Sequence, residues 1–112
     1  EMINDVLKES ENVRAIHFDG LLVDFCRQVG ACAIIRGLRA VSDYEYELQI
    51  FSVNKQLAPG LETVFLMSST QYSFLSSSIV KEVAKYGGDV STMVPQAVEA
   101  FLKRRFSGAS AE

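Results

Sequence analysis

Two arginines that flank a short Gly-Leu pair directly follow an apolar run. The run, residues 32–35 (C-A-I-I), has the composition of a strand buried on both faces, and the chain then breaks into Arg36, Gly37, Leu38 and Arg39. Ligands of open α/β sheets collect at the carboxyl ends of strands. Glycine lets backbone N–H groups approach a ligand, and arginine offers a planar fork of donors that matches phosphate. The stretch therefore predicts an anion site.

The same two arginines have an alternative role as loop cations that pair with acids. Asp43, Glu45 and Glu47 follow on the next predicted helix, and each is a potential partner. Glu47 has two readings of its own, because it could bind ribose hydroxyls or pair with an arginine. The ordinary reading of an isolated helical glutamate is a solvated charge. The spacing alone leaves these alternatives open.

A second candidate anion site is the segment over residues 72–78 (Y-S-F-L-S-S-S). Its last three serines open a predicted helix, where hydroxyls would stand beside free backbone N–H groups. The alternative is ordinary N-capping by one serine. Tyr72 and Phe74 could flank a flat ring such as adenine, or pack in the core. A P-loop is excluded because the Gly-Lys-Ser/Thr ending is missing.

The remaining candidates carry little chemistry. Leu22 follows a predicted strand and could line a pocket, although such a leucine is more often core. His17 is the only histidine, and we expect it to be a strand residue without a chemical role. Cys26 and Cys32 have the setting of small core residues. This set offers no catalytic triad and no zinc site, and it suits a phosphorylated ligand better than acid–base chemistry.

Strands and helices alternate three times along the chain. This order implies parallel strands with right-handed crossovers, an α/β fold. The local signals for helix ends are Asp19 as an N-cap, Gly30 as a stop, a Ser42-x-x-Glu45 capping box and Pro95 at a first helical position. The predicted elements are helices over residues 1–10, 19–29, 42–57, 76–86 and 95–107, and strands over residues 13–18, 32–35 and 62–67.

The helix over residues 43–57 is apolar on more than one side. Tyr44, Leu48 and Phe51 form a second stripe, which predicts burial at a subunit contact. The alternative is that this helix lies between the sheet and another helix of the same subunit.

The composition is that of one globular domain. The chain has 112 residues, of which 48% are hydrophobic, and a net charge of −3. This balance gives no basic footprint for nucleic acid. No apolar run approaches the ~18 residues of a membrane span. The cysteine usage fits a reducing cytoplasm, and we expect residues 107–112 to form a flexible tail.

Four motifs together resemble bacterial phosphopantetheine adenylyltransferase. They are I-I-R-G-L-R-A-V-S-D-Y-E-Y-E, L-A-P-G-L-E-T-V-F-L-M, Y-S-F-L-S-S-S-I-V-K-E-V and G-G-D-V, and the match runs in register over about residues 13–106. That family has a Rossmann-like nucleotidyltransferase fold. It transfers the adenylyl group of ATP to 4′-phosphopantetheine, giving dephospho-coenzyme A and pyrophosphate in coenzyme A biosynthesis. It uses Mg²⁺ and is commonly hexameric.

The resemblance also implies binding roles for individual residues. By position, Leu22 would contact the pantetheine arm and Arg36 its phosphate, and Arg39 would lie on the phosphates of ATP. The remaining members of the implied ATP site are Gly37, Leu38, Glu47, Tyr72, Ser73, Phe74, Leu75, Ser76, Ser77 and Ser78.

The front of the family pattern is absent from these residues. The family's first strand carries a threonine and a histidine motif, and a lysine-bearing loop follows its second strand. His17 lies at the third-strand position and does not replace that histidine. We therefore expect residues 1–112 to be the C-terminal portion of one nucleotidyltransferase domain, without its first two strands and catalytic residues, and inactive alone. The alternatives are a non-catalytic nucleotide- or coenzyme A-binding module and an adenylyltransferase with another acceptor, such as nicotinate mononucleotide.

Overall fold

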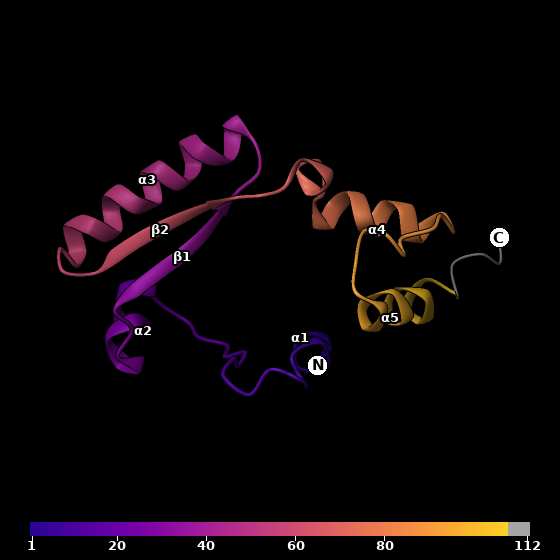
Figure 1. The fold of residues 1–112 in the computed structure, drawn as a ribbon, viewed down its shortest axis with the longest axis horizontal. Coiled ribbons are helices and arrows are strands. Elements are labelled where there is room, and N and C mark those ends of the chain that lie inside the picture. Colours follow the sequence, from indigo (N-terminus) through magenta and orange to yellow (C-terminus); the bar gives the residue numbers. More distant parts are fainter. Residues whose placement is uncertain (108–112) are drawn as a thin grey trace. The chain divides into compact units, whose positions relative to one another are not determined.

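The computed structural model describes residues 1–107, and the chain divides into two compact units (Figure 1). The first unit is His17–Phe74, and the second comprises Glu1–Ile16 and Leu75–Glu112. The first unit contains α2 (Leu22–Val29), β1 (Ala33–Leu38), α3 (Val41–Leu57), β2 (Glu62–Met67) and the 3₁₀ turn η1 (Thr70–Tyr72), and the second contains α1 (Met2–Val6), α4 (Ser77–Lys85) and α5 (Gln96–Phe106).

A parallel pair of strands joined by a helical crossover forms the centre of the first unit. β1 and β2 pair from Ala33 opposite Glu62 to Leu38 opposite Met67, and α3 lies along one face of the pair (Figure 1). Ile34 and Leu38 are buried on that face. The rings of Phe51 and Phe65 meet edge to face with their centroids 6.1 Å apart. The predicted α/β fold with parallel strands flanked by helices is confirmed.

β1 is longer than its apolar run. Arg36 and Gly37 lie within the strand, opposite Phe65 and Leu66, because backbone pairing with β2 continues past Ile35. The prediction that the chain leaves the strand at Arg36 is therefore wrong.

The strand is also not buried on both faces. Ile35, Val64 and Leu66 on the face opposite α3 are 69%, 48% and 57% exposed. Cys32, expected in the core, is exposed just before the strand, whereas Cys26 is buried as predicted.

Residues 13–18 do not form the predicted strand. The backbone there has no regular structure, and its side chains are exposed. A strand exists only when a neighbouring strand accepts its hydrogen bonds. Among the described residues, β1 and β2 pair only with each other, so residues 13–18 have no strand partner. Phe18 instead stacks on Phe25 of α2, with 4.4 Å between ring centroids.

Two predicted helix starts differ from the structure. α2 has Leu21 at its N-cap rather than Asp19, although Gly30 ends it in the left-handed conformation (φ 69°), as predicted. α3 has Ala40 at its N-cap instead of Ser42. Asp43 supplies the carboxylate that reaches back over the first turn, where it accepts a hydrogen bond from the Ala40 backbone N–H (3.3 Å).

The second unit packs α4 and α5 around a small apolar cluster. Val80, Val90 and Leu102 are its buried members. α1 is shorter than predicted, and a turn follows it. Pro95 is the N-cap of α5 rather than its first residue. The predicted tail, apart from residue 107, lies outside the described residues.

Two of the three residues in the second stripe of α3 are exposed within their unit. Tyr44 and Leu48 are 54% and 45% exposed, whereas Phe51 is half-buried against Phe65. The alternative of a helix enclosed between the sheet and another helix is thus wrong for this unit, and the subunit contact stays a prediction. No helix in the described part of the chain is long and apolar enough to cross a membrane.

Candidate functional site

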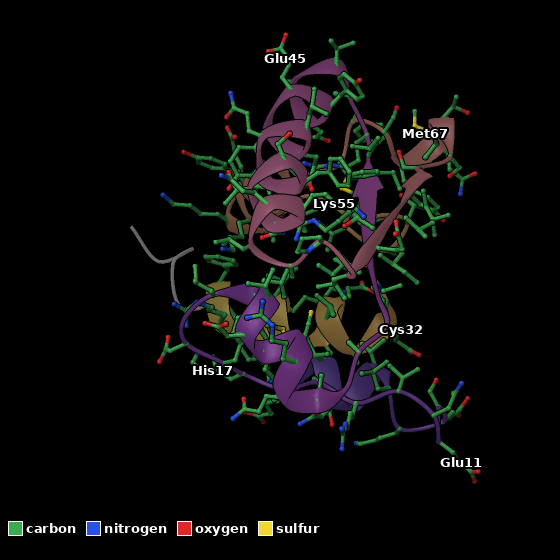
Figure 2. The ribbon with its side chains drawn as sticks, turned by 90° about the vertical axis from the view of Figure 1, so that its left-hand side faces the viewer. Glu11, His17, Cys32, Glu45, Lys55 and Met67 are labelled. Atoms are coloured by element: carbon green, nitrogen blue, oxygen red, sulfur yellow. The ribbon has the colours of Figure 1, made fainter. Side chains whose placement is uncertain are left out.

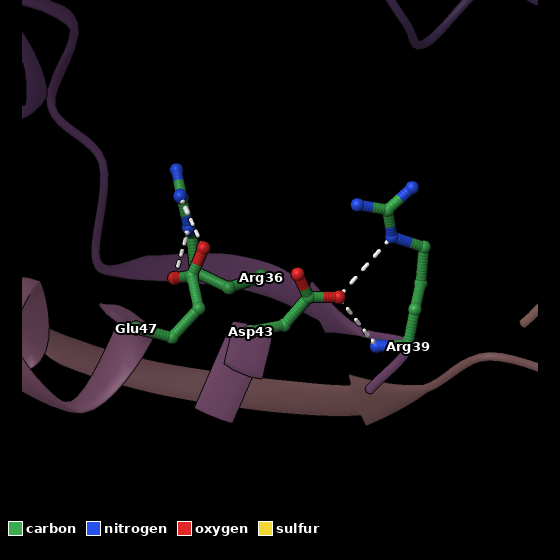
Figure 3. A network of polar contacts seen from close by, with 4 residues as sticks. All are labelled: Arg36, Arg39, Asp43 and Glu47. Carbon is green, nitrogen blue, oxygen red and sulfur yellow. Dashed lines mark hydrogen bonds and ion pairs between the residues drawn. The ribbon is translucent and has the colours of Figure 1, made fainter. Parts of the chain in front are cut away.

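Arg36 and Glu47 form a two-bonded ion pair between β1 and α3 (Figure 3). The guanidinium donates from Nε to Oε2 (2.7 Å) and from Nη2 to Oε1 (2.6 Å). Arg36 points to the α3 face because it is two residues from each of the buried residues Ile34 and Leu38, and every second residue of a strand lies on the same face. The side chain of Glu47 is only 11% exposed and that of Arg36 35%. Of the readings left open for Glu47, the pairing with an arginine is the one observed.

This contact stabilises the charged forms of both groups. The hydrogen bond from Arg36 and its positive charge lower the pKa of Glu47 below its ordinary value of 4.5, although burial opposes the shift. The same hydrogen bond raises the pKa of Arg36. Tyr46 also lies near enough to raise the pKa of Arg36 slightly further. The pair therefore stays ionised at neutral pH.

Arg39 and Asp43 form a second pair where β1 meets α3 (Figure 3). Asp43 Oδ2 accepts hydrogen bonds from the Arg39 backbone N–H (3.1 Å) and from its Nε (3.2 Å). These hydrogen bonds lower the pKa of Asp43. The Asp43 carboxylate thereby holds both the backbone between β1 and α3 and the side chain of Arg39. Glu45, the third acid considered, points outward from α3 (Figure 2) and makes no ion pair within the described residues.

Ser68, which the sequence analysis missed, lies at the carboxyl end of β2. Its backbone N–H donates to the Leu38 carbonyl (2.8 Å), continuing the strand pairing by one residue. Its hydroxyl oxygen is shielded from solvent and has no hydrogen-bond partner among the described residues. Its position directly after the predicted strand was the one available signal.

Gly37 and Leu38 differ in environment. Leu38 is buried on the α3 face, so its side chain is part of the core. Gly37 lies on the exposed face, and a Cβ built there would meet no atom within 4 Å. A ligand could therefore approach the Gly37 backbone from that open side.

The second candidate anion site, over residues 72–78, is divided between the two units. Tyr72, Ser73 and Phe74 belong to the first unit, where both aromatic side chains are exposed. Leu75 and the three serines belong to the second. Ser76 caps α4 by accepting a hydrogen bond from the Ile79 N–H (3.2 Å), which is the N-capping alternative. Ser77 and Ser78 are exposed on the first turn of α4.

Leu22 is the first residue of α2 and is half-buried. A pocket of about 450 Å³ opens beside it, lined by Phe18, Gly20, Leu21 and Phe25 among others, but not by Leu22 itself.

Metal binding and histidine acid–base chemistry each place requirements on the described residues. His17, the first residue of the first unit and labelled in Figure 2, is exposed. Within the part of the chain that the structure describes, no three His, Cys, Asp or Glu side chains gather closely enough to hold a metal ion. The site as observed can bind and orient anions through two arginines that acids hold in place.

The sequence pattern of a known family covers most of this region. The model of the Cytidylyltransferase-like family matches residues 1–83, well over half of the chain. The match contains the Arg36–Glu47 and Arg39–Asp43 ion pairs, both strands and most of α4.

Proposed function

Since the chain belongs to the cytidylyltransferase-like family, we propose that it serves the transfer of the adenylyl group of ATP to 4′-phosphopantetheine. The products are dephospho-coenzyme A and pyrophosphate. Family membership supports nucleotidyl transfer in general. The choice of substrates rests on the R-G-L-R-A-V-S-D-Y-E-Y-E and S-S-S-I-V-K-E motifs. The observation that carries the proposal is the half-buried guanidinium of Arg36, the first residue of the R-G-L-R-A-V-S-D-Y-E-Y-E motif. Two hydrogen bonds to Glu47 fix its position.

The acceptor site is built on Arg36 and Leu22 in this proposal. Arg36 binds the phosphate of 4′-phosphopantetheine, since a guanidinium presents paired donors to phosphate oxygens. Leu22 contacts the pantetheine arm. This role of Leu22 rests on the family resemblance alone, because Leu22 does not line the neighbouring pocket, whose wall includes charged residues such as Asp24 and Arg27.

The nucleotide-binding residues are taken from the family resemblance, and those around β1 lie at its end and in the loop after it. Arg39 lies on the phosphates of ATP, and the open backbone at Gly37 allows close approach. Glu47 is an ATP contact in this proposal, as in the resembling family. The further ATP-binding residues that we propose are Leu38, Tyr72, Ser73, Phe74, Leu75, Ser76, Ser77 and Ser78.

Positioning and charge neutralisation are the contributions of these residues to the reaction. Holding donor and acceptor in line lowers the barrier to phosphoryl-type transfer, and cationic groups stabilise the developing charge. Mg²⁺ would neutralise the phosphates of ATP. We propose that the phosphates of the nucleotide and water hold this Mg²⁺, since Mg²⁺ in such sites commonly keeps several waters and binds substrate phosphates. We assign no catalytic residue within residues 1–112 and propose that these residues bind without turnover by themselves.

Self-association and location complete the proposal. The exposed stripe of Tyr44 and Leu48 on α3 supports a contact between subunits, in a hexamer as in the resembling family. We place the protein in the cytoplasm, where its free cysteines would remain reduced.

A non-catalytic nucleotide- or coenzyme A-binding module is the second candidate. The observation that favours it is the exposed position of the single histidine, His17. Calorimetric titrations of the purified protein with ATP, CTP, 4′-phosphopantetheine, nicotinate mononucleotide and coenzyme A separate the candidates. The adenylyltransferase proposal expects ATP and 4′-phosphopantetheine to bind together. A preference for CTP or nicotinate mononucleotide would overturn it, and binding of coenzyme A alone would favour the module.

A further inference from the structure

Glu47 occupies only one edge of the Arg36 guanidinium. An arginine has five N–H donors, and the two bonds to Glu47 use the Nε–H and one N–H of Nη2. Within the described residues, Nη1 makes no hydrogen bond. Figure 3 shows the outer end of the guanidinium pointing away from the carboxylate. The second edge, formed by Nη1 and Nη2, is thus a complete two-donor fork.

The carboxylate that sets this orientation is itself held firmly. Glu47 belongs to the middle of the 17-residue helix α3, and its side chain is 11% exposed. Arg36 is anchored in β1, so both ends of the contact start from regular backbone. A free arginine side chain would sample many rotamers and would lose that freedom on binding a ligand. The contact with Glu47 removes most of this entropy loss in advance.

The charges of the pair also affect what it binds. Glu47 neutralises Arg36, so the net attraction for an anion is weaker than that of a lone arginine. Affinity then depends on geometry, because two parallel N–H···O bonds are strong only when both donors are aligned. A phosphate monoester offers two oxygens at a suitable spacing.

We propose that Glu47 is a positioning residue for a phosphate monoester, which it serves by holding one edge of Arg36 so that the Nη1–Nη2 edge receives the phosphate. This inference deepens the proposed function and rests on its assignment of Arg36 to the acceptor phosphate. It changes the role of Glu47 from an ATP contact to a support of the acceptor site. The ion pair remains closed when phosphate binds.

The first test follows arginine side-chain resonances by ¹⁵N NMR while inorganic phosphate is added to the wild-type protein. The Nε–H resonance of Arg36, assigned by its loss in Arg36→Lys, should stay hydrogen-bonded throughout the titration while the Nη resonances shift. Movement of the Nε–H resonance to the position of a solvated arginine would mean that phosphate displaces Glu47, and the proposal would be wrong. An unchanged Arg36 spectrum would overturn it equally.

The second test compares variants by calorimetry. Glu47→Gln should weaken binding of 4′-phosphopantetheine about tenfold, because the loss of a fixed direction for the Nη1–Nη2 edge outweighs the positive charge that Arg36 gains when its partner is neutral. The same variant should leave binding of pantetheine, which lacks the phosphate, unchanged. Glu62→Gln is the matched control, because it removes one carboxylate that pairs with Lys55 and is 70% exposed. Equal or tighter binding by Glu47→Gln would contradict the positioning role.

These results separate the inference from the proposed function. Wild-type protein that binds 4′-phosphopantetheine no better than pantetheine contradicts the proposed function, whatever Glu47 does. Wild-type protein that distinguishes the two ligands, together with a Glu47→Gln variant that does so equally well, contradicts the inference alone. In either case, the titration with inorganic phosphate tests whether Arg36 stays bonded to Glu47 while its Nη1–Nη2 edge binds phosphate.

Discussion

Arg36 and Glu47 are eleven positions apart in the chain and are joined by two hydrogen bonds of 2.7 and 2.6 Å. One residue lies on a strand and the other on the helix that crosses over it. The contact therefore fixes the position of α3 on the sheet as well as the direction of one guanidinium. Stability and ligand binding share this feature, and variants at the pair should affect both.

Removal of the carboxylate should destabilise the first unit. Glu47→Ala leaves Arg36 half-buried without its partner, and we expect the free energy of unfolding to fall by about 1–2 kcal/mol. Urea unfolding followed by circular dichroism measures the change. Glu62→Ala removes an exposed pair and should cost no more than about 0.5 kcal/mol. Equal effects of the two variants would show that burial of the Arg36 pair adds nothing.

Stability should depend on acid pH through the same carboxylate. The pKa of Glu47 in the folded protein lies below its ordinary value of 4.5, because Arg36 donates to it. A lowered folded pKa means that the unfolded state binds protons first as pH falls. The stabilisation is complete above pH 4.5 and disappears as pH falls through the lower folded value. Urea midpoints of wild type and Glu47→Gln should differ at pH 7, and the difference should shrink progressively as pH falls below 4.5; a constant difference down to acid pH would contradict this assignment.

The cap of α4 should be sensitive to one serine of the run. Ser76 accepts from the Ile79 N–H, so Ser76→Ala should lower stability by about 1 kcal/mol. Ser76→Asp keeps an acceptor at the N-cap and should restore most of it. Ser77→Ala, at an exposed neighbouring position, is the control with an expected change within about 0.5 kcal/mol. A larger loss at Ser77 than at Ser76 would count against the observed cap.

Glycine substitutions should separate binding from stability. A Cβ at Gly37 meets nothing within 4 Å, so Gly37→Ala should leave the unfolding midpoint nearly unchanged while it weakens ATP binding. A Cβ at Gly88 would lie 2.6 Å from Val83 Cγ1, so Gly88→Ala should destabilise by about 1–3 kcal/mol. Calorimetry and thermal unfolding of both variants measure the two effects. Unchanged ATP affinity in Gly37→Ala would remove that backbone from the nucleotide site.

The exposed stripe on α3 should control self-association. Leu48→Lys places a charge on a surface that we assign to a subunit contact, and the oligomer should dissociate in sedimentation velocity experiments. Gln49→Lys, at an exposed position of the same helix about 100° around it from Leu48, is the control for added charge. A monomeric wild-type protein, or an oligomer that Leu48→Lys leaves intact, would contradict the assignment.

Local sequence signals predicted the elements that local chemistry determines. β2 has the predicted bounds, Gly30 ends its helix and Ser76 is an N-cap. The strand predicted over residues 13–18 is wrong because a strand needs a partner strand, which no local sequence pattern reveals. β1 extended to Leu38 for the same reason, since pairing with β2 continues beyond the apolar residues.

The candidate site could be predicted only in part. The residue types at Arg36 and Glu47 indicated an anion site or an ion pair, and the choice depended on how the crossover places α3 on β1. Asp43 rather than Glu45 pairs with Arg39, because Asp43 lies on the first turn of α3 beside the end of the strand. The solvent-shielded hydroxyl of Ser68 had no signal apart from its place after a strand.

The most direct test of the central claim is a calorimetric comparison of 4′-phosphopantetheine with pantetheine on the wild-type protein and on Arg36→Ala. The account predicts that the wild-type protein binds the phosphorylated ligand at least about tenfold more tightly, from one charge-assisted paired contact. Arg36→Ala should bind both ligands equally and weakly. Equal affinity of the wild-type protein for the two ligands, or full retention of the preference in Arg36→Ala, would contradict it.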